Sequence, residues 1–171
     1  VERQLQITRQ CLAVLAEFRN PVGIVTKNHL VTRDIDILRE LAAHQAVTVN
    51  LSINSLDAEL ARKLEPRASS PKFRLAAVEA LASAEIAVGV LVAPVIPGLN
   101  DHEILSVLGE ARKAGAQWAG MQMLRLPLAV APLFEDWLER NVPGQKARVL
   151  NRIRAMRDGK LNDPRFGQRM R

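Results

Sequence analysis

Residues 86–98, Ile-Ala-Val-Gly-Val-Leu-Val-Ala-Pro-Val-Ile-Pro-Gly, form the most apolar stretch of this 171-residue chain. A continuous apolar run rich in β-branched residues is typical of a strand buried on both faces of a parallel sheet. Pro97-Gly98 closes the run, and Asn100 or Asp101 can cap a helix that follows and ends at Gly115. The stretch therefore predicts a buried strand followed by a helix.

The same alternation extends outward in both directions. Strands are expected at 22–26, 47–53, 86–96 and 118–126, and helices at 5–18, 35–42, 55–64, 70–81, 100–114 and 133–156, the last interrupted at Pro143-Gly144. This alternation implies right-handed βαβ units and a parallel sheet, so the fold class is α/β. A complete eight-stranded barrel takes about 250 residues. Periodicity therefore leaves two architectures open, a partial (β/α) barrel and an open doubly wound sheet.

Composition narrows the class of protein. Hydrophobic residues make up 48% and charged residues 25% of the chain, a globular balance that excludes a disordered chain or a disulfide scaffold. The single cysteine, Cys11, cannot form an internal disulfide or a cysteine-only metal site, and we expect it to be a core or partly buried residue. No apolar run approaches the length of a membrane helix, and the N-terminus lacks a signal peptide. We therefore expect a cytoplasmic protein without a membrane partner.

Charge is distributed unevenly along the chain. Residues 140–171 contain ten Lys and Arg against two Asp and Glu, a net charge of +8, whereas residues 1–139 carry a net charge of −2. This predicts a barrel part over 1–139 and a basic C-terminal helix and tail over 140–171, packed on it or extending from it. Such a segment can contact nucleic-acid phosphates, or it can be a solvated helix. The candidate nucleic-acid contacts are Arg148, Arg152, Arg154, Arg165 and Arg169.

Function in parallel α/β folds sits at the carboxyl ends of the strands. Lys27 follows the first expected strand and can pair with a carboxylate or phosphate, or be a solvated loop lysine. Ser52 and Asn54, two residues apart, point to one face and can bind a ligand or cap a helix.

Two further groups of residues stand at this expected edge. Glu65, Arg67 and Arg74 flank a helix break, where they can form an ion-pair cluster for a ligand carboxylate or a surface network. Gly98 allows close backbone approach before a helix N-terminus. The sequence contains no metal motif, phosphate loop, dinucleotide fingerprint or nucleophile elbow.

Several ordered motifs together resemble one known family. They are Ile24-Val25-Thr26-Lys27-Asn28, Asn50-Leu51-Ser52-Ile53, Leu64-Glu65-Pro66-Arg67-Ala68, residues 92–101, Leu124-Arg125-Leu126-Pro127, Leu150-Asn151-Arg152-Ile153-Arg154 and Asp163-Pro164-Arg165-Phe166-Gly167. The set resembles the radical S-adenosylmethionine proteins, in the branch named DNA repair photolyase or spore photoproduct lyase-related. The resemblance covers essentially the whole chain.

The resemblance implies a partial (β/α) barrel that binds S-adenosylmethionine across its strand ends and a [4Fe–4S] cluster near its first strand. The resemblance also implies that the cluster cleaves S-adenosylmethionine reductively to a 5′-deoxyadenosyl radical. A reductant protein would supply the electron for this cleavage. The residues that the resemblance assigns to S-adenosylmethionine are Lys27 at its carboxylate, Ser52 and Asn54 near its ribose or headgroup, Glu65, Arg67 and Arg74 in the neighbouring wall, and Val95, Ile96 and Gly98 at the adenine.

The chain departs from this family in one large respect. Neither the first strand nor the Cys-x3-Cys-x2-Cys motif that holds the cluster is present, and Cys11 alone cannot replace three thiolates. We therefore expect the C-terminal part of a longer lyase-like enzyme, inactive by itself, with DNA photoproduct repair as the activity. The alternatives are a non-catalytic module that binds nucleic acid or a partner through its basic tail, and an α/β enzyme that binds phosphate.

Overall fold

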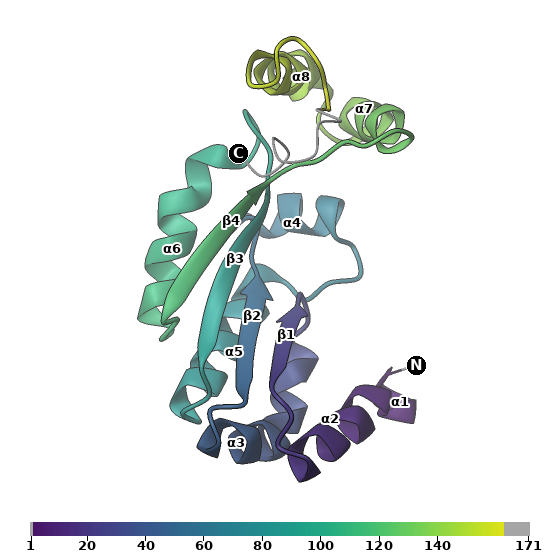
Figure 1. Cartoon of the computed structure of the whole chain (residues 1–171). Coiled ribbons are helices and arrows are strands. Elements are labelled where there is room, and N and C mark those ends of the chain that lie inside the picture. The colour runs from purple at the N-terminus through teal and green to yellow at the C-terminus, as the bar shows by residue number, and fades with distance from the viewer. Residues whose placement is uncertain (1, 163–171) are drawn as a thin grey trace.

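Four apolar runs of the chain form four strands in the computed structural model, which describes residues 2–162. The strands are β1 (Val22–Thr26), β2 (Val47–Ser52), β3 (Val88–Val95) and β4 (Trp118–Met123). They form one sheet in the order β1-β2-β3-β4, and each neighbouring pair is parallel. The sheet confirms the α/β class and is consistent with the partial barrel (Figure 1).

Helices occupy the segments before, between and after the strands, as the alternation predicts. They are α1 (Glu2–Leu5), α2 (Ile7–Glu17), α3 (Ile35–Ala43), α4 (Ala58–Leu64), α5 (Pro71–Ser83), α6 (Ile104–Lys113), α7 (Val130–Asn141) and α8 (Lys146–Ala155), with short 3-10 turns η1 (His29–Asp34), η2 (Asp101–Glu103) and η3 (Pro143–Gln145). The opening helix is divided because Gln6 has a left-handed backbone, φ 51°. None of the helices in the described range is long and apolar enough to cross a membrane.

Three expected strands are shorter than the runs that predicted them, β2 by one residue and β3 and β4 by more. The N–H of Ile86 donates to the carbonyl of Leu81, so Ile86 completes the turn after α5. At the other end of β3, the N–H of Ile96 donates to the side chain of Asn100 and leaves the sheet. Leu126 lies beyond the end of β4 because its side chain is buried in a separate core. The apolar runs at these ends therefore extend beyond the residues that pair in the sheet.

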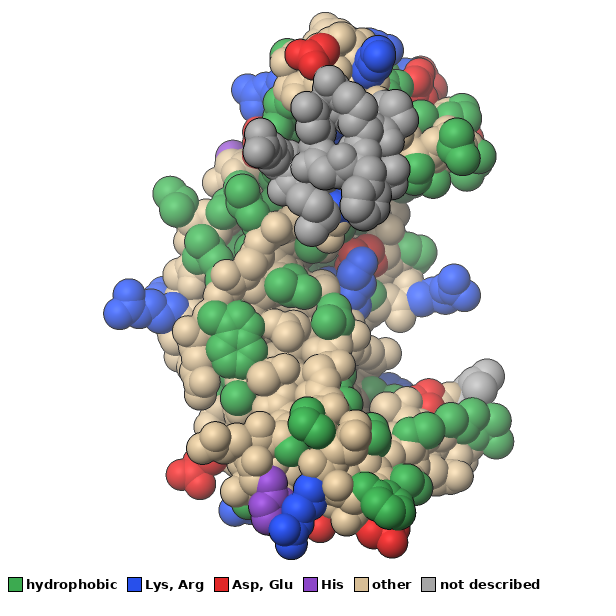
Figure 2. Space-filling view, viewed as in Figure 1, with side chains coloured by type: hydrophobic (Ala, Val, Ile, Leu, Met, Phe, Trp, Pro, Cys, Tyr) green, Lys and Arg blue, Asp and Glu red, His purple; other side chains and the backbone are tan. Residues whose placement is uncertain are grey.

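The main core lies on one face of the sheet only. Helices α3, α5 and α6 cover this face, where Val49, Leu51 and Val90 are fully buried (Figure 1). No helix within residues 2–162 covers the opposite face, and Val25 there is 65% exposed. Figure 2 looks onto this open face, which is mostly uncharged over β3 and β4. Helices thus cover one face of the sheet and leave the opposite face open.

A second core stands at the carboxyl ends of the strands. It is built from Ile96, Leu99, Leu126, Phe134, Leu138, Val149, Leu150 and Ile153, with Leu60 and Leu64 of α4 packed against it. Helices α7 and α8 therefore sit above the sheet edge (Figure 1). The expected boundary between residues 139 and 140 falls inside α7, and that division stays a prediction.

Candidate functional site

A shared carboxylate joins the ends of β1 and β2. The Nζ of Lys27, which follows β1, lies 2.6 Å from Oε1 of Glu65, and Nη2 of Arg74 lies 2.7 Å from Oε2 of the same group. Glu65 directly follows α4, and Arg74 stands near the start of α5. The side chain of Lys27 is 44% exposed, whereas that of Arg74 is 1% exposed. One carboxylate thus links a cation that faces solvent to a cation that is buried.

Arg74 also fixes the backbone around this carboxylate. Its Nε donates to the carbonyl of Ser69 at 2.7 Å, and its Nη1 donates to the carbonyl of Ser52 at 2.8 Å. The N–H of Ser69 donates to the carbonyl of Lys27 at 3.1 Å. The Oγ of Ser69 accepts from the N–H of His29 at 2.9 Å. Arg74 and Ser69 therefore tie the two strand ends together.

Ser52 and Asn54 are both buried at the end of β2. Neither caps α4, because Asp57 does so by accepting from the N–H groups of Glu59 and Leu60. The Oδ1 and Nδ2 of Asn54 have no hydrogen-bond partner among the described residues. A buried amide left without partners costs about 1–3 kcal/mol, and such groups usually bind water, an ion or a ligand. Asn54 is therefore a polar group suited to a ligand at this edge.

Asn100 holds the loop after β3 against the end of β2. Its Oδ1 accepts from the N–H of Ile96 at 2.6 Å, and its Nδ2 donates to the carbonyls of Asn54 at 2.6 Å and Pro94 at 3.0 Å. The prediction that Asn100 or Asp101 caps the following helix is wrong, because neither side chain caps a backbone N–H there. The side-chain amide of Asn100 instead binds backbone groups of its own loop and of the end of β2.

Glu103 makes a second clamp between the same two loops. Its Oε1 accepts from Oγ of Ser55 at 2.6 Å, and its Oε2 accepts from the N–H groups of Leu56 at 2.7 Å and Asp57 at 3.3 Å. These roles of Asn100 and Glu103 were not predicted from the sequence. The available signal was two amide- or carboxylate-bearing residues spaced three apart, directly after the loop that closes the most apolar strand.

The residues expected at an adenine are covered in this structure. Val95 belongs to the main core and Ile96 to the second core. Gly98 has φ 84°, and a Cβ there would lie 3.0 Å from Cδ of Arg152 and 3.4 Å from Nε of Arg148. The side chains of α8 therefore lie directly over this loop.

The other candidate cations are placed in different ways. Arg67 is exposed and lines a hollow of about 460 Å³ with Lys27, but it forms no ion pair with Glu65. In α8, Nη1 of Arg152 donates to Asp101 at 2.8 Å, and Arg148 is exposed. Arg154 is partly buried, and Arg165 and Arg169 lie outside the described residues.

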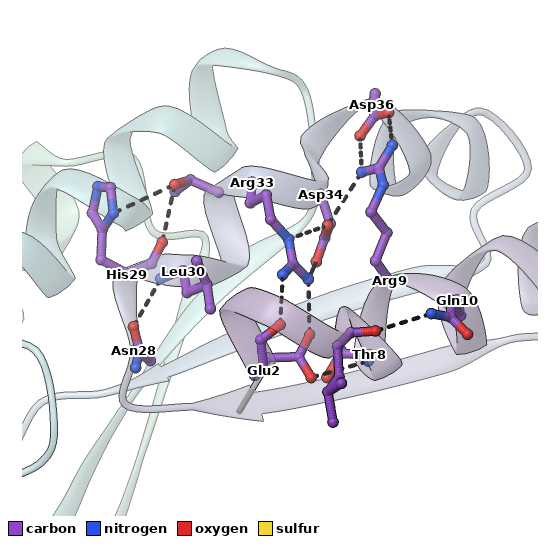
Figure 3. Close-up of polar contacts among 12 residues, drawn as sticks. Glu2, Thr8, Arg9, Gln10, Asn28, His29, Leu30, Arg33, Asp34 and Asp36 are labelled. Atoms are coloured by element: carbon purple, nitrogen blue, oxygen red, sulfur yellow. Dashed lines mark hydrogen bonds and ion pairs between the residues drawn. The ribbon is translucent and has the colours of Figure 1, made fainter.

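A separate charged network joins α1 and α2 to η1 and α3 (Figure 3). The guanidinium of Arg9 lies 2.5 Å from Oδ2 of Asp36 through its Nη2, and 3.2 Å from Oδ1 of Asp34 through its Nη1. The Nη2 of Arg33 lies 2.7 Å from Oδ2 of Asp34 and 2.9 Å from Oε1 of Glu2. Burial acts to raise the pKa of Asp34, but the hydrogen bonds from Arg33 and Arg9 outweigh it and lower that pKa. The hydrogen bond from Arg9 lowers the pKa of Asp36 to about 2. This network anchors the N-terminal helices rather than forming part of the strand-end site.

The environment of Cys11 differs from the prediction. Cys11 is exposed, because Leu12 and Ala16 form the buried face of α2 and Cys11 lies on its outer side. Within residues 2–162, no three His, Cys, Asp or Glu side chains gather in a way that could hold a metal ion. The described residues therefore do not fit an iron–sulfur cluster.

Comparisons with known proteins agree with this architecture. Residues 3–111 match the model of the Radical SAM superfamily. The chain is 31% identical over 163 residues to an uncharacterized protein of Mycobacterium tuberculosis, covering 94% of this chain and 47% of that protein. It is 28% identical over 152 residues to an uncharacterized protein of Methanocaldococcus jannaschii, covering 89% and 55% respectively.

The matched relatives are longer than this chain. The chain spans about half the length of the curated relatives it matches. An uncharacterized protein of Acidianus two-tailed virus is 39% identical over 74 residues, which is 43% of this chain and 24% of that protein. No solved structure gives a significant match.

Proposed function

Since this chain belongs to the radical SAM superfamily, we propose that its strand-end site binds S-adenosylmethionine as part of a longer enzyme. The observation that carries the proposal is the convergence of Lys27, Ser52 and Asn54 at the carboxyl ends of two neighbouring parallel strands. A half-exposed ammonium suits the ligand's carboxylate, and the unpartnered amide of Asn54 suits a hydroxyl or amino group.

The residues present fit the two groups that the family implies to different degrees. S-Adenosylmethionine supplies a radical when a reduced [4Fe–4S] cluster cleaves it. Lys27, Ser52 and Asn54 would hold the sulfonium compound, with Glu65 and Arg74 behind Lys27. The cluster needs three thiolates, and the sequence has one cysteine. We therefore assign no step of the cleavage to residues of this chain and expect it to be inactive alone.

The substrate that we propose is DNA carrying a photoproduct, in a lyase-type repair reaction. Arg148 and Arg152 stand over Gly98, at the same edge of the sheet as Lys27. Lys and Arg side chains contact phosphates whatever the base sequence, and such contacts position a duplex. The basic helix α8 would thus hold a nucleic acid beside the strand ends, and a reductant protein would supply the electron.

Calorimetry tests the binding of S-adenosylmethionine. We expect Lys27→Ala to weaken binding about tenfold or more without unfolding the chain, because a hydrogen bond to a charged group contributes about 1.5–3 kcal/mol. Arg62→Ala, which removes an exposed cation from neighbouring α4, is the control. Equal affinities of the wild type and Lys27→Ala would remove Lys27 from the site.

Two experiments test the reaction and its substrate. The full-length Mycobacterium tuberculosis relative, reconstituted anaerobically with iron and sulfide and given a reductant, is expected to release 5′-deoxyadenosine. Binding of this chain to duplex DNA is expected to fall as salt rises, and Arg148→Ala is expected to make the salt dependence shallower. Absence of DNA binding at low salt contradicts the proposed substrate. A relative that forms no cluster contradicts the proposed reaction.

A further inference from the structure

The ammonium of Lys27 forms an ion pair with the carboxylate of Glu65, which a buried guanidinium also contacts. Glu65 is 11% exposed at its side chain and receives Arg74 on Oε2, while Lys27 reaches Oε1 at 2.6 Å. Arg74 is 1% exposed and has an acceptor for each of its three nitrogens. The position of the Glu65 carboxylate is therefore set by a buried guanidinium that is itself hydrogen-bonded at every nitrogen.

Lys27 by itself has no such constraint. A lysine side chain has four rotatable bonds, and ordering it costs rotamer entropy whenever it binds an anion. Its ammonium has three donors, so contact with Glu65 leaves donors for a second acceptor. Arg74 balances the charge of Glu65, so this carboxylate repels an approaching anion little. Lys27 can therefore bind a ligand carboxylate while it keeps its ion pair with Glu65.

We propose that Glu65 is the positioning residue of this site, holding the Lys27 ammonium in place for the carboxylate of the ligand. Arg74 orients Glu65 in turn, and Arg67 has no part in the arrangement because it is exposed and makes no ion pair with Glu65. The inference rests on the proposed function, since it takes the ligand to be an adenosyl amino acid.

Ligands that differ only in the amino-acid part test the role of Glu65. S-Adenosylhomocysteine carries the carboxylate, and 5′-methylthioadenosine lacks the amino-acid part. We expect Glu65→Gln to weaken binding of S-adenosylhomocysteine about tenfold and to leave binding of 5′-methylthioadenosine within a factor of two. Lys72→Gln, which removes an exposed cation of α5 outside this hollow, is the matched control and is expected to change neither affinity.

The outcomes separate the two proposals. If the wild type binds neither adenosyl compound at millimolar concentration, the proposed function and this inference both fail. If the wild type binds both and Glu65→Gln weakens both equally, Glu65 has only a structural role and the inference alone fails. Tighter binding of S-adenosylhomocysteine by Glu65→Gln makes Glu65 a competing counter-ion, which also overturns it.

A measurement on the wild type covers the case in which Glu65→Gln does not fold, since that change leaves Arg74 buried without its counter-ion. Nitrogen-15 NMR detects a lysine ammonium when a close ion pair slows its proton exchange. We expect a protected signal from Lys27 before S-adenosylhomocysteine is added, identified by its loss in Lys27→Gln. A Lys27 ammonium that exchanges as fast as that of exposed Lys72 overturns the inference.

Discussion

Arg74 is the residue on which the strand-end site depends most. It is almost fully buried, and each of its nitrogens donates to a separate acceptor. We expect Arg74→Met to lower the free energy of unfolding by about 3 kcal/mol or more, because it leaves Glu65 without its buried partner and two carbonyls unmatched. Urea unfolding measures this change. Arg67→Met, seven positions away and exposed, is expected to stay within about 0.5 kcal/mol of the wild type.

Gly89 is required by an aromatic ring that lies across it. A Cβ at Gly89 would lie 2.1 Å from Nε1 of Trp118, which donates to Oδ1 of Asn50 at 2.9 Å. We expect Gly89→Ala to displace the ring, shift tryptophan fluorescence to the red and destabilise the fold by about 1 kcal/mol. In a Trp118→Ala background the same change is expected to be neutral or stabilising. A cost of the same size in both backgrounds contradicts this explanation.

Single residues were only partly predictable from the sequence. Polar groups at the carboxyl ends of the strands marked Lys27 and Ser52, because parallel strands bring these ends to one edge. Position along the chain could not show that Arg74 pairs with Glu65 whereas Arg67 does not, because that depends on how the chain turns between α4 and α5. Side-chain direction also decided Cys11, which lies one residue from a buried position and is exposed.

At the level of elements, charged side chains hold α2 against η1 and α3, and this contact depends on pH. Asp36 has a pKa of about 2 in the folded chain, against 3.8 ordinarily. A lowered pKa contributes stability that is complete above the ordinary value and disappears as pH falls through the folded value. We expect the stability difference between the wild type and Asp36→Asn to shrink from about pH 4 to pH 2.

Urea unfolding at several pH values measures this difference. Glu40→Gln, which removes an exposed carboxyl from the same helix α3, is the control. A difference between the wild type and Asp36→Asn that is constant from pH 6 to pH 2 contradicts the role of Asp36 in the network.

Element type was predictable, whereas several element ends were not. Apolar runs and Pro or Gly breaks gave all four strands and the order of the helices. The ends of β3 and β4 were placed too far along because Ile96 and Leu126 are apolar for another reason, namely burial under α7 and α8. A second core at the strand ends has no periodic signature that separates it from the first.

For the whole molecule, the edges and the open face of the sheet offer surfaces for association. Within the described residues, β1 and β4 each have a neighbour on one side only, and Val25 on the open face of β1 is exposed. The outer side of α2 adds Ile7, Val14 and Phe18, all more than half exposed. Exposed strand edges and apolar patches favour association.

We expect Phe18→Glu to weaken self-association of the chain at least about tenfold, because burying one aromatic side chain contributes about 1.5–3 kcal/mol. Sedimentation over a range of concentrations measures the association constant. Leu105→Glu removes an apolar residue of α6 that is at least as exposed as Phe18, and it is the control. If both substitutions have the same effect, association does not involve the α2 surface.

The strand order has a consequence for how the chain acquires its fold. Every neighbour in the sheet is also the next strand along the chain, with paired residues such as Val22 and Val47, Val49 and Val88, and Gly89 and Trp118. Each pairing therefore closes a loop of moderate length, and the entropy of closure rises only slowly with length. During synthesis, β2 therefore meets β1 already made, and β3 and β4 are each added beside the strand made just before. None of these pairings among the four described strands joins strands that are not consecutive in the sequence.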